Sequence, residues 1–179
     1  ERIKINGVNC EKEFVFDFIQ KLRNIPEEIL PSFFEFTTIM AFEYFYQKKV
    51  DFAIIEVGLG GRLDSTNIIK PLVSAITNVD LDHQNILGET LEEIATEKAG
   101  IVKPNIPIIS GDERDLVKNI IQQKAIGYHS EFIDATEIST DLETDLKGNY
   151  QKKNIRVVLA LVDELRKQNI KISESSLEN

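Results

Sequence analysis

The feature that most constrains this chain is a pair of apolar runs in which polar residues do not alternate regularly with apolar ones. Residues 50–57 have the sequence VDFAIIEV and residues 72–79 the sequence LVSAITNV, and helical patterns precede the first run and follow the second. Strands of a parallel sheet are covered on both faces and are therefore apolar throughout, whereas half-exposed strands alternate. The two runs predict an α/β protein whose mostly parallel sheet is flanked by helices in three layers.

Two helix starts are marked by capping boxes, in which a Ser or Thr is followed three residues later by Glu. Ser32 and Glu35 precede an aromatic-rich stretch that runs to about residue 48, and Thr90 and Glu93 precede a shorter stretch. The first of these helices is apolar on several faces. We therefore expect it to be largely buried.

The remaining elements continue the alternation of strands and helices. At 179 residues and 42% hydrophobic content, the chain is long enough for one domain with a sizeable core, which we predict to span residues 1–179. Asn6-Gly7 is a turn signal after the first predicted strand. The other predicted strands lie at 2–6, 107–110 and 131–133, and the other predicted helices at about 14–22, 116–124 and 150–165, the last capped by Asn149.

Composition excludes several classes of function. The 21 Lys and Arg against 30 Asp and Glu give a net charge of -9, which repels nucleic-acid backbones and anionic membranes. No apolar run is long enough to cross a bilayer. Cys10 is the single cysteine, which is incompatible with an internal disulfide and fits a reducing, cytoplasmic location. We therefore expect neither a nucleic-acid partner nor a membrane partner.

Glu56 ends the first apolar run and is followed by Gly58, Gly60 and Gly61. In open parallel sheets ligands bind at the carboxyl ends of the strands, and glycines allow the backbone to approach a ligand closely. The dinucleotide-binding pattern G-x-G-x-x-G does not fit, because its third glycine is replaced by Leu63. The alternative is a tight turn without a ligand, in which Arg62 pairs locally with the nearby Asp at position 64.

His83 follows the second apolar run in the same way. Taken singly it is more simply a loop histidine than a ligand or a general base. Two neighbouring strands that each end in a potential ligand change that balance, because Glu56 and His83 together suit Mg2+, which leaves its other positions to water and phosphate. Lys98 falls in the last turn of the helix after Thr90, where the helix dipole alone explains a lysine.

Several long motifs occur in the order of a known family. EVGLGGRLDSTN and ITNVDLDHQNILGETLEEIATEKAGIVKP, with ERIKING, PSFFEFTTIMAF and GNYQKKN, resemble the signatures of folylpolyglutamate synthases, including bifunctional dihydrofolate synthases, in the Mur ligase superfamily. The resemblance covers essentially all 179 residues. It implies the central, ATPase-type domain of such an enzyme, with a fold similar to that of P-loop NTPases.

The same resemblance implies roles for individual residues. Glu56 and His83 match the ligands of Mg2+, and Lys98 matches the lysine that family members carry as a carbamate, a further metal ligand. Asn154, with Gln151 beside it, matches the residues that contact the base of ATP. Tyr150 stands where the family has histidine. A lysine whose pKa is lowered by burial can take up CO2 and become an anionic ligand.

The activity that the resemblance implies is ATP-dependent amide formation. A folate carboxylate is phosphorylated by ATP, and the amine of L-glutamate then displaces phosphate, with Mg2+ neutralising the phosphate charge. Dihydropteroate is a further expected substrate of the bifunctional members. The cofactors expected for the whole enzyme are therefore ATP and Mg2+.

One family motif is absent from the sequence. No G-x-x-x-x-G-K-[ST] phosphate loop occurs, so we expect the chain to lack both that segment and the C-terminal ligase domain, and to be inactive alone. A sheet without its first strand exposes an edge, which predicts self-association. Two other interpretations stay open: a Mur-type cell-wall peptide ligase with the same acyl-phosphate chemistry, and a non-catalytic interaction module.

Overall fold

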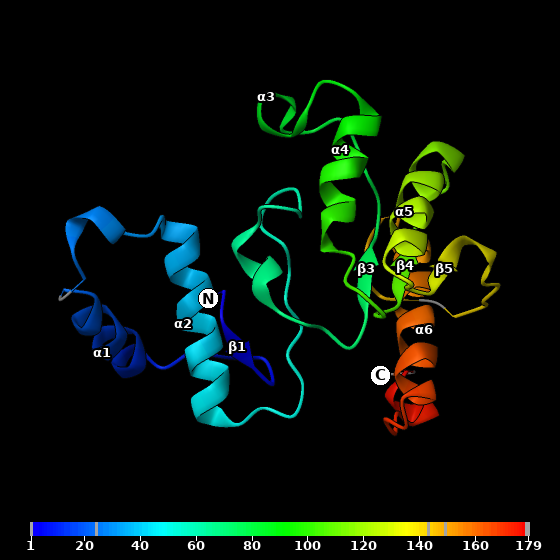
Figure 1. The fold of residues 1–179 in the computed structure, drawn as a ribbon. Coiled ribbons are helices and arrows are strands. Elements are labelled where there is room, and N and C mark those ends of the chain that lie inside the picture. The colour runs from blue at the N-terminus through cyan, green and yellow to red at the C-terminus, as the bar shows by residue number, and fades with distance from the viewer. Residues whose placement is uncertain (1, 24, 143, 149, 178–179) are drawn as a thin grey trace. The chain divides into compact units, whose positions relative to one another are not determined.

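The computed structural model describes residues 2–23, 25–142, 144–148 and 150–177. The chain forms two compact units, Glu1–Gly58 and Leu59–Asn179 (Figure 1). The single domain predicted over residues 1–179 stays a prediction, since a domain can contain more than one compact unit.

The first unit begins with a short hairpin. Strands β1 (Lys4–Ile5) and β2 (Val8–Asn9) pair antiparallel, with Ile5 opposite Val8. Between them Asn6 and Gly7 both have positive φ, of 50° and 79°. A two-residue loop with positive φ at both positions is the type I′ turn that Asn-Gly favours. The predicted turn is confirmed, and the predicted strand at residues 2–6 is confirmed at its centre.

Two helices complete the regular structure of this unit. Helix α1 (Lys12–Leu22) packs against helix α2 (Phe33–Lys48) through aromatic rings, with Phe18 edge-on to Phe36 at 5.3 Å between centroids. The capping box of α2 is present, because the Ser32 hydroxyl accepts from the amide N–H of Glu35 and the Glu35 carboxylate accepts from that of Ser32. Both helices were predicted.

The expected burial of α2 is wrong. Thr38 and Tyr44 are its buried residues, whereas Phe33 and Tyr46 are strongly exposed. The aromatic residues are distributed around the whole circumference of the helix, and α1 covers only one side of it. An apolar composition on all faces therefore does not produce burial unless a partner covers each face.

The strand predicted at residues 50–57 is also wrong. These residues belong to neither sheet of the described chain, and Ile54 is 97% exposed. A strand requires a neighbour that supplies backbone hydrogen bonds, and the described residues contain no such neighbour for this segment.

The second unit contains the parallel sheet. Strands β3 (Ser74–Ile76), β4 (Ile108–Ser110) and β5 (Phe132–Asp134) lie in the order β3-β4-β5, and both pairings are parallel. Their register places Ile76 opposite Ser110 and Ser110 opposite Asp134. The predicted α/β class and parallel sheet are confirmed, with strands shorter than the apolar runs.

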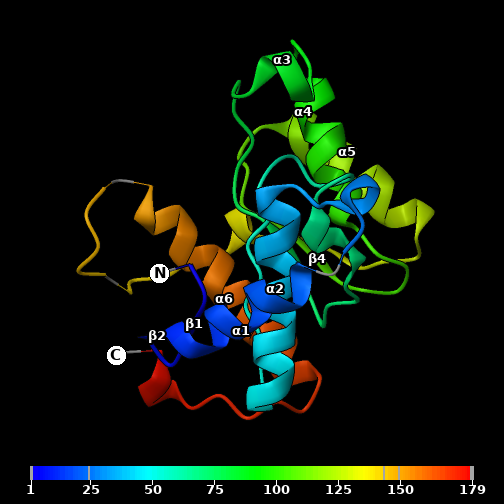
Figure 2. The ribbon, with the colours of Figure 1, turned by 90° about the vertical axis from the view of Figure 1, so that its left-hand side faces the viewer.

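Helices cover both faces of this sheet. Figure 2 shows α4 (Leu91–Lys98) and α5 (Asp115–Gly127) on one side of β4 and α6 (Gln151–Lys167) on the other. Successive residues of β4 serve the two sides, because Ile108 packs in the core with α4 and α5, and Ile109 in the core with α6. Alternation along a strand thus explains why β4 is buried throughout.

Short elements link these parts. Helix α3 (Gln84–Leu87) follows the end of β3. The cap predicted at Asn149 lies outside the described residues, and α6 follows Tyr150, whose side chain makes no capping hydrogen bond. The 3-10 turns lie at Glu27–Ile29, Ser65–Ile68, Ala99–Ile101, Ala135–Glu137 and Glu174–Ser176.

Candidate functional site at the carboxyl edge of the sheet

The glycine-rich loop after residue 58 lies against the C-terminal turn of α4. The amide N–H of Arg62 donates to the carbonyl of Glu97 over 2.9 Å, which satisfies one of the last carbonyl groups of the helix. A Cβ atom on Gly61 would lie only 2.8 Å from the carbonyl oxygens of Glu97 and Lys98. Glycine is therefore required at position 61 because the two backbones meet there.

Gly100, which follows the end of α4, allows the same close approach of the two backbones. A Cβ atom on Gly100 would lie 2.3 Å from Cβ of Arg62 and 2.4 Å from its Cα. Asn67 then bridges the two segments, because its side-chain amide donates to the carbonyls of Arg62 and Gly100, each over 3.1 Å. The loop and the helix end that carries Lys98 thus form one fixed assembly.

The turn in this loop differs from the turn without a ligand considered in the sequence. Arg62 does not pair with Asp64; its guanidinium contacts the carboxylate of Glu97 at 3.0 Å. Asp64 instead accepts from the amide N–H of Leu59 and from that of Thr66, each over 2.9 Å. The charged residues of the motif therefore hold the shape of the loop.

Lys98 is the last residue of α4 and is half-buried. Among the described residues, its ammonium group has no hydrogen-bond or ion-pair partner. Its position agrees with the favourable interaction of a cation with a helix C-terminus. Because no carboxylate is paired with it, the amine is free to serve another purpose.

His83 lies in the loop that follows β3. Its side chain is 55% exposed, and its Nε2 lies 3.6 Å from a carboxylate oxygen of Asp82. Its backbone has φ 50°, a left-handed conformation that is uncommon for residues other than glycine. The loop after β3 therefore presents an exposed imidazole next to a carboxylate.

Two residues that were not predicted hold the start of this loop. Asp112 follows β4 and is buried, and Arg114 donates to its carboxylate from Nε over 2.8 Å and from Nη2 over 2.6 Å. Burial raises the pKa of Asp112, but hydrogen bonds from Arg114 and from the amide N–H of Val79 outweigh it and bring the pKa below its usual range. Ligands bind at the carboxyl ends of parallel strands, and this expectation, applied to β4, would have identified Asp112.

Glu56 belongs to the first unit, where it is exposed near the end of the segment at residues 50–57. His83 and Lys98 belong to the second unit. A shared magnesium site for Glu56 and His83 stays a prediction.

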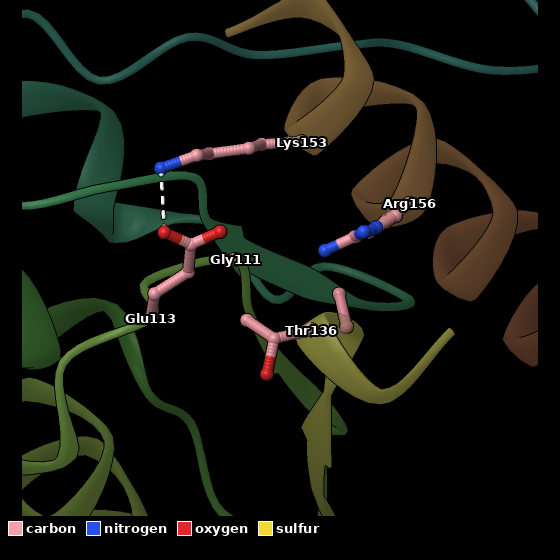
Figure 3. A pocket seen from close by; sticks show the side chains of 6 residues that line it. Gly111, Glu113, Thr136, Lys153 and Arg156 are labelled. Carbon is pink, nitrogen blue, oxygen red and sulfur yellow. Dashed lines mark hydrogen bonds and ion pairs between the residues drawn. The ribbon is translucent and has the colours of Figure 1, made fainter. Parts of the chain in front are cut away.

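A hollow lies where β4 and β5 end and α6 begins. Figure 3 shows Lys153 reaching from α6 to the Glu113 carboxylate, at 2.7 Å, and Arg156 pointing into the same space. The hydrogen bond from Lys153 lowers the pKa of Glu113, and the nearby charge of Arg156 adds to this effect. The residues that line the hollow are Gly111, Glu113, Ala135, Thr136, Lys153 and Arg156.

The two residues expected at the ATP base are not part of that lining. Gln151 and Asn154 lie three residues apart on α6 and so share a face of the helix, which differs from the face of Lys153 and Arg156. The Asn154 amide donates to the Gln151 carbonyl oxygen over 3.1 Å. The structure pairs the two predicted amides with each other, and neither residue lines the hollow.

The two residues predicted to bind Mg2+ lie in different units, Glu56 in the first and His83 in the second. Among the described residues no three His, Cys, Asp or Glu side chains surround a common point. A carboxylate and an imidazole are nevertheless a suitable set for Mg2+, which commonly takes one or two protein ligands and fills its other positions with water and phosphate. Glu56 and His83 have that chemistry.

No helix in the described part of the chain is both long and apolar enough to span a membrane.

No family model matches the chain. Among curated relatives, the dihydrofolate synthase/folylpolyglutamate synthase of Bacillus subtilis is 35% identical over 99% of this chain and 48% of its own length. The folylpolyglutamate synthase of Lacticaseibacillus casei is 34% identical over 87% of this chain and 42% of its own length. The chain thus spans about half the length of these relatives.

Solved structures agree with the sequence relatives. Folylpolyglutamate synthase from Thermotoga maritima superposes with a TM-score of 0.83 at 29% identity, over 98% of this chain and 46% of the other. An E. coli FolC structure with bound ADP gives a TM-score of 0.84 at 27% identity, over 98% and 45%. Another neighbour is a folylpolyglutamate synthase complex with AMPPCP and folate, with a TM-score of 0.82 at 30% identity, over 93% of this chain and 46% of the other.

Proposed function

We propose that this chain, which belongs to the folylpolyglutamate and dihydrofolate synthase family, is part of an ATP-dependent ligase that joins L-glutamate to a folate. The observation that carries the proposal is the agreement of sequence and fold over nearly the whole chain. In the proposed reaction a folate carboxylate takes the γ-phosphoryl group of ATP, and the glutamate amine displaces phosphate from the acyl phosphate. Dihydropteroate is a second proposed acceptor.

Glu56 and His83 are the proposed protein ligands of Mg2+. This assignment is supported by the donor types and by the position of Glu56 near the end of one apolar run and of His83 shortly after the other. When bound, Mg2+ would neutralise charge on the phosphates of ATP. The chain itself supplies the carboxylate and the imidazole that orient it.

Lys98 is the proposed carbamate. Its neutral amine would add to CO2, forming an N–C bond and releasing one proton, and the product is an anion. The absence of an ion-pair partner among the described residues supports this role. Under 13C-labelled bicarbonate, a carbamate resonance should disappear in Lys98→Arg and persist in Lys124→Arg, a lysine of α5. A resonance that survives in Lys98→Arg would refute the assignment.

Gln151 and Asn154 are the proposed contacts to the base of ATP. Their side chains are already paired, so a single orientation of both amides is presented from the first turn of α6. Asn154→Ala should weaken ATP binding more than Asn119→Ala, a change on another helix of the same unit. Equal affinities in the two variants would remove this assignment.

The decisive experiment measures ligation by the complete product of the gene that encodes this sequence, because these 179 residues contain no phosphate-loop motif. Labelled glutamate should enter a reduced folate only when ATP and Mg2+ are present. Glu56→Gln should reduce kcat/KM by about a hundredfold or more. Asp51→Asn, which removes an exposed carboxylate from the same segment, is the matched control and should keep activity.

The result also separates the alternatives. Incorporation of an amino acid into a nucleotide-linked muramyl peptide, with none into folate, would favour the cell-wall ligase. Failure to bind Mg-ATP by calorimetry would favour an interaction module. The motif GLGGRLDSTN supports the folate branch.

A cytoplasmic location and self-association are further parts of the proposal. Cys10 is a free thiol, which fits a reducing compartment. Among the described residues, β3 and β5 each have one strand neighbour, so each has an edge without a partner. Light scattering over a range of concentrations should detect an oligomer, and a constant monomer mass would contradict this expectation.

A further inference from the structure

The loop that carries His83 is held at its base by a pair of residues from the next strand. Asp112 and Arg114, here named the clamp, lie just after β4. The amide N–H of Val79 donates to Asp112 Oδ2 over 2.8 Å, and Arg114 Nη2 donates to the carbonyl of Val79. Both backbone polar groups of Val79 are therefore fixed by the clamp.

The clamp is itself rigid because both oxygens of the Asp112 carboxylate accept hydrogen bonds. Asp112 is only 2% exposed and accepts from the amide N–H of Arg114 over 2.9 Å, in addition to the guanidinium and Val79. A buried carboxylate is costly unless it is hydrogen-bonded and paired, and a planar guanidinium forms such pairs with defined geometry. Removing the guanidinium would leave the buried Asp112 carboxylate without its charged partner, which is energetically costly.

Further hydrogen bonds fix the chain between Val79 and His83. Arg114 Nη1 donates to Asp80 over 3.3 Å, and the side-chain amide of Asn78 donates to the other Asp80 oxygen over 2.7 Å. His83 itself has a left-handed backbone, which persists only where the surrounding chain enforces it. Three residues separate Val79, which is fully buried, from this imidazole, which is exposed.

We propose that Asp112 and Arg114 are positioning residues, which fix the path of residues 79–83 and thereby the direction in which His83 presents its imidazole to a divalent ion. The inference rests on the proposed role of His83 as a ligand of Mg2+. Neither residue touches the ion; both act through the backbone of Val79 and the side chain of Asp80. A loop fixed before binding loses less entropy when the ion binds.

The first test follows backbone amide exchange by NMR in the chain without metal. Arg114→Gln should raise exchange in residues 79–83 by about tenfold or more, while exchange in α5 stays near that of the unaltered chain. Glu113→Gln is the matched control, because it removes a neighbouring carboxylate that pairs with Lys153 and not with the loop. Unchanged exchange in residues 79–83 of Arg114→Gln would overturn the proposal.

The second test uses Mn2+ as the probe and follows the broadening of the His83 side-chain resonances. Arg114→Gln should require about tenfold more Mn2+ for the same broadening, and Glu113→Gln should match the unaltered chain. Arg114→Lys keeps the charge but not the planar fork, so it should restore only part of the effect. If Arg114→Gln unfolds, seen as rapid exchange throughout α5, Arg114→Lys alone decides.

The outcomes distinguish this proposal from the one on which it rests. Faster loop exchange with unchanged Mn2+ broadening would show that the clamp only stabilises the fold, and would overturn its positioning role. Mn2+ that leaves His83 sharp in the unaltered chain would refute the ligand role of His83 itself. The proposed folate ligation would then still be tested independently by the glutamate incorporation assay of the gene product.

Discussion

Of the two apolar runs from which the fold was predicted, one contains a paired strand and the other does not. Glu56 lies near the end of the first run and His83 shortly after the second, and both residues are proposed to bind Mg2+. The run at residues 72–79 contains β3, pairs with β4 and buries Ile76 and Val79. The run at residues 50–57 has no strand partner in the described chain, and Ile54 lies on the surface.

The difference shows what a sequence pattern specifies. Both runs specify an extended, apolar segment, but strand pairing is a property of two segments. Leu72–Val79 has a partner inside its own compact unit, in β4. The described residues offer no strand partner to 50–57. Local preference is therefore the same in both runs, and long-range contact decides between them.

The largest expected effect is in backbone hydrogen exchange. Amides of β3 and β4 should exchange about a thousandfold or more slowly than those of residues 53–57, because paired core strands open only in global unfolding. NMR exchange rates of the chain test this directly. Comparable protection in both runs would mean that residues 50–57 have a strand partner.

The next effect concerns one residue type in the two runs. Ile76→Ala should lower the free energy of unfolding by about 2–5 kcal/mol, because its side chain lies in the core with α4 and α5. Ile54→Ala should change it by less than about 0.5 kcal/mol, since that side chain is 97% exposed. Urea unfolding of the two variants measures both values. Equal decreases in the free energy of unfolding would mean that Ile54 and Ile76 are buried to a similar extent.

A third effect concerns the loop that follows the first run. Gly100→Ala should destabilise the second unit by about 1–3 kcal/mol, because the added Cβ meets the backbone of Arg62. Gly127→Ala is the matched control, with no atom within 4 Å of its new Cβ, and should be neutral or slightly stabilising. If the two variants unfold alike in urea, the loop does not pack on α4 as described.

The smallest effect is the pH dependence contributed by the clamp. The pKa of Asp112 is lowered from its ordinary value of 3.8, so its ionised form stabilises the folded state. That contribution is complete above the ordinary pKa and is lost as the pH falls through the folded one. Urea unfolding between about pH 5 and pH 2 should therefore show a shallower pH dependence in Asp112→Asn. Asp115→Asn, which removes an exposed carboxylate, should keep the dependence of the unaltered chain.

Local signals in the sequence were accurate. The Asn6-Gly7 turn and both capping boxes form as predicted, because each depends on residues within three positions of one another. The helices and the parallel sheet of the second unit also follow from periodicity, since their partners lie in the same unit. Lys98 lies at a helix end, as expected, whereas His83 lies in the loop after β3, directly before helix α3.

Predictions that needed a distant partner were less successful. The burial of α2 and the strand at residues 50–57 both failed for that reason. The pairing of Arg62 with Glu97 was not predicted, because Glu97 is 35 residues away. The contacts of the clamp were missed because Asp112 and Arg114 act on Val79, more than 30 residues earlier in the chain.

The sequence by itself determined the α/β class, the helix starts, the turn chemistry and, through its ordered motifs, the family. Each of these depends on short-range stereochemistry or on linear patterns that one chain displays in full. Only the tertiary structure decided which apolar run becomes a strand, why glycine is required at positions 61 and 100, and what holds the loop of His83. Those features arise where backbones distant in sequence come within hydrogen-bonding or van der Waals distance, and no local pattern encodes that distance.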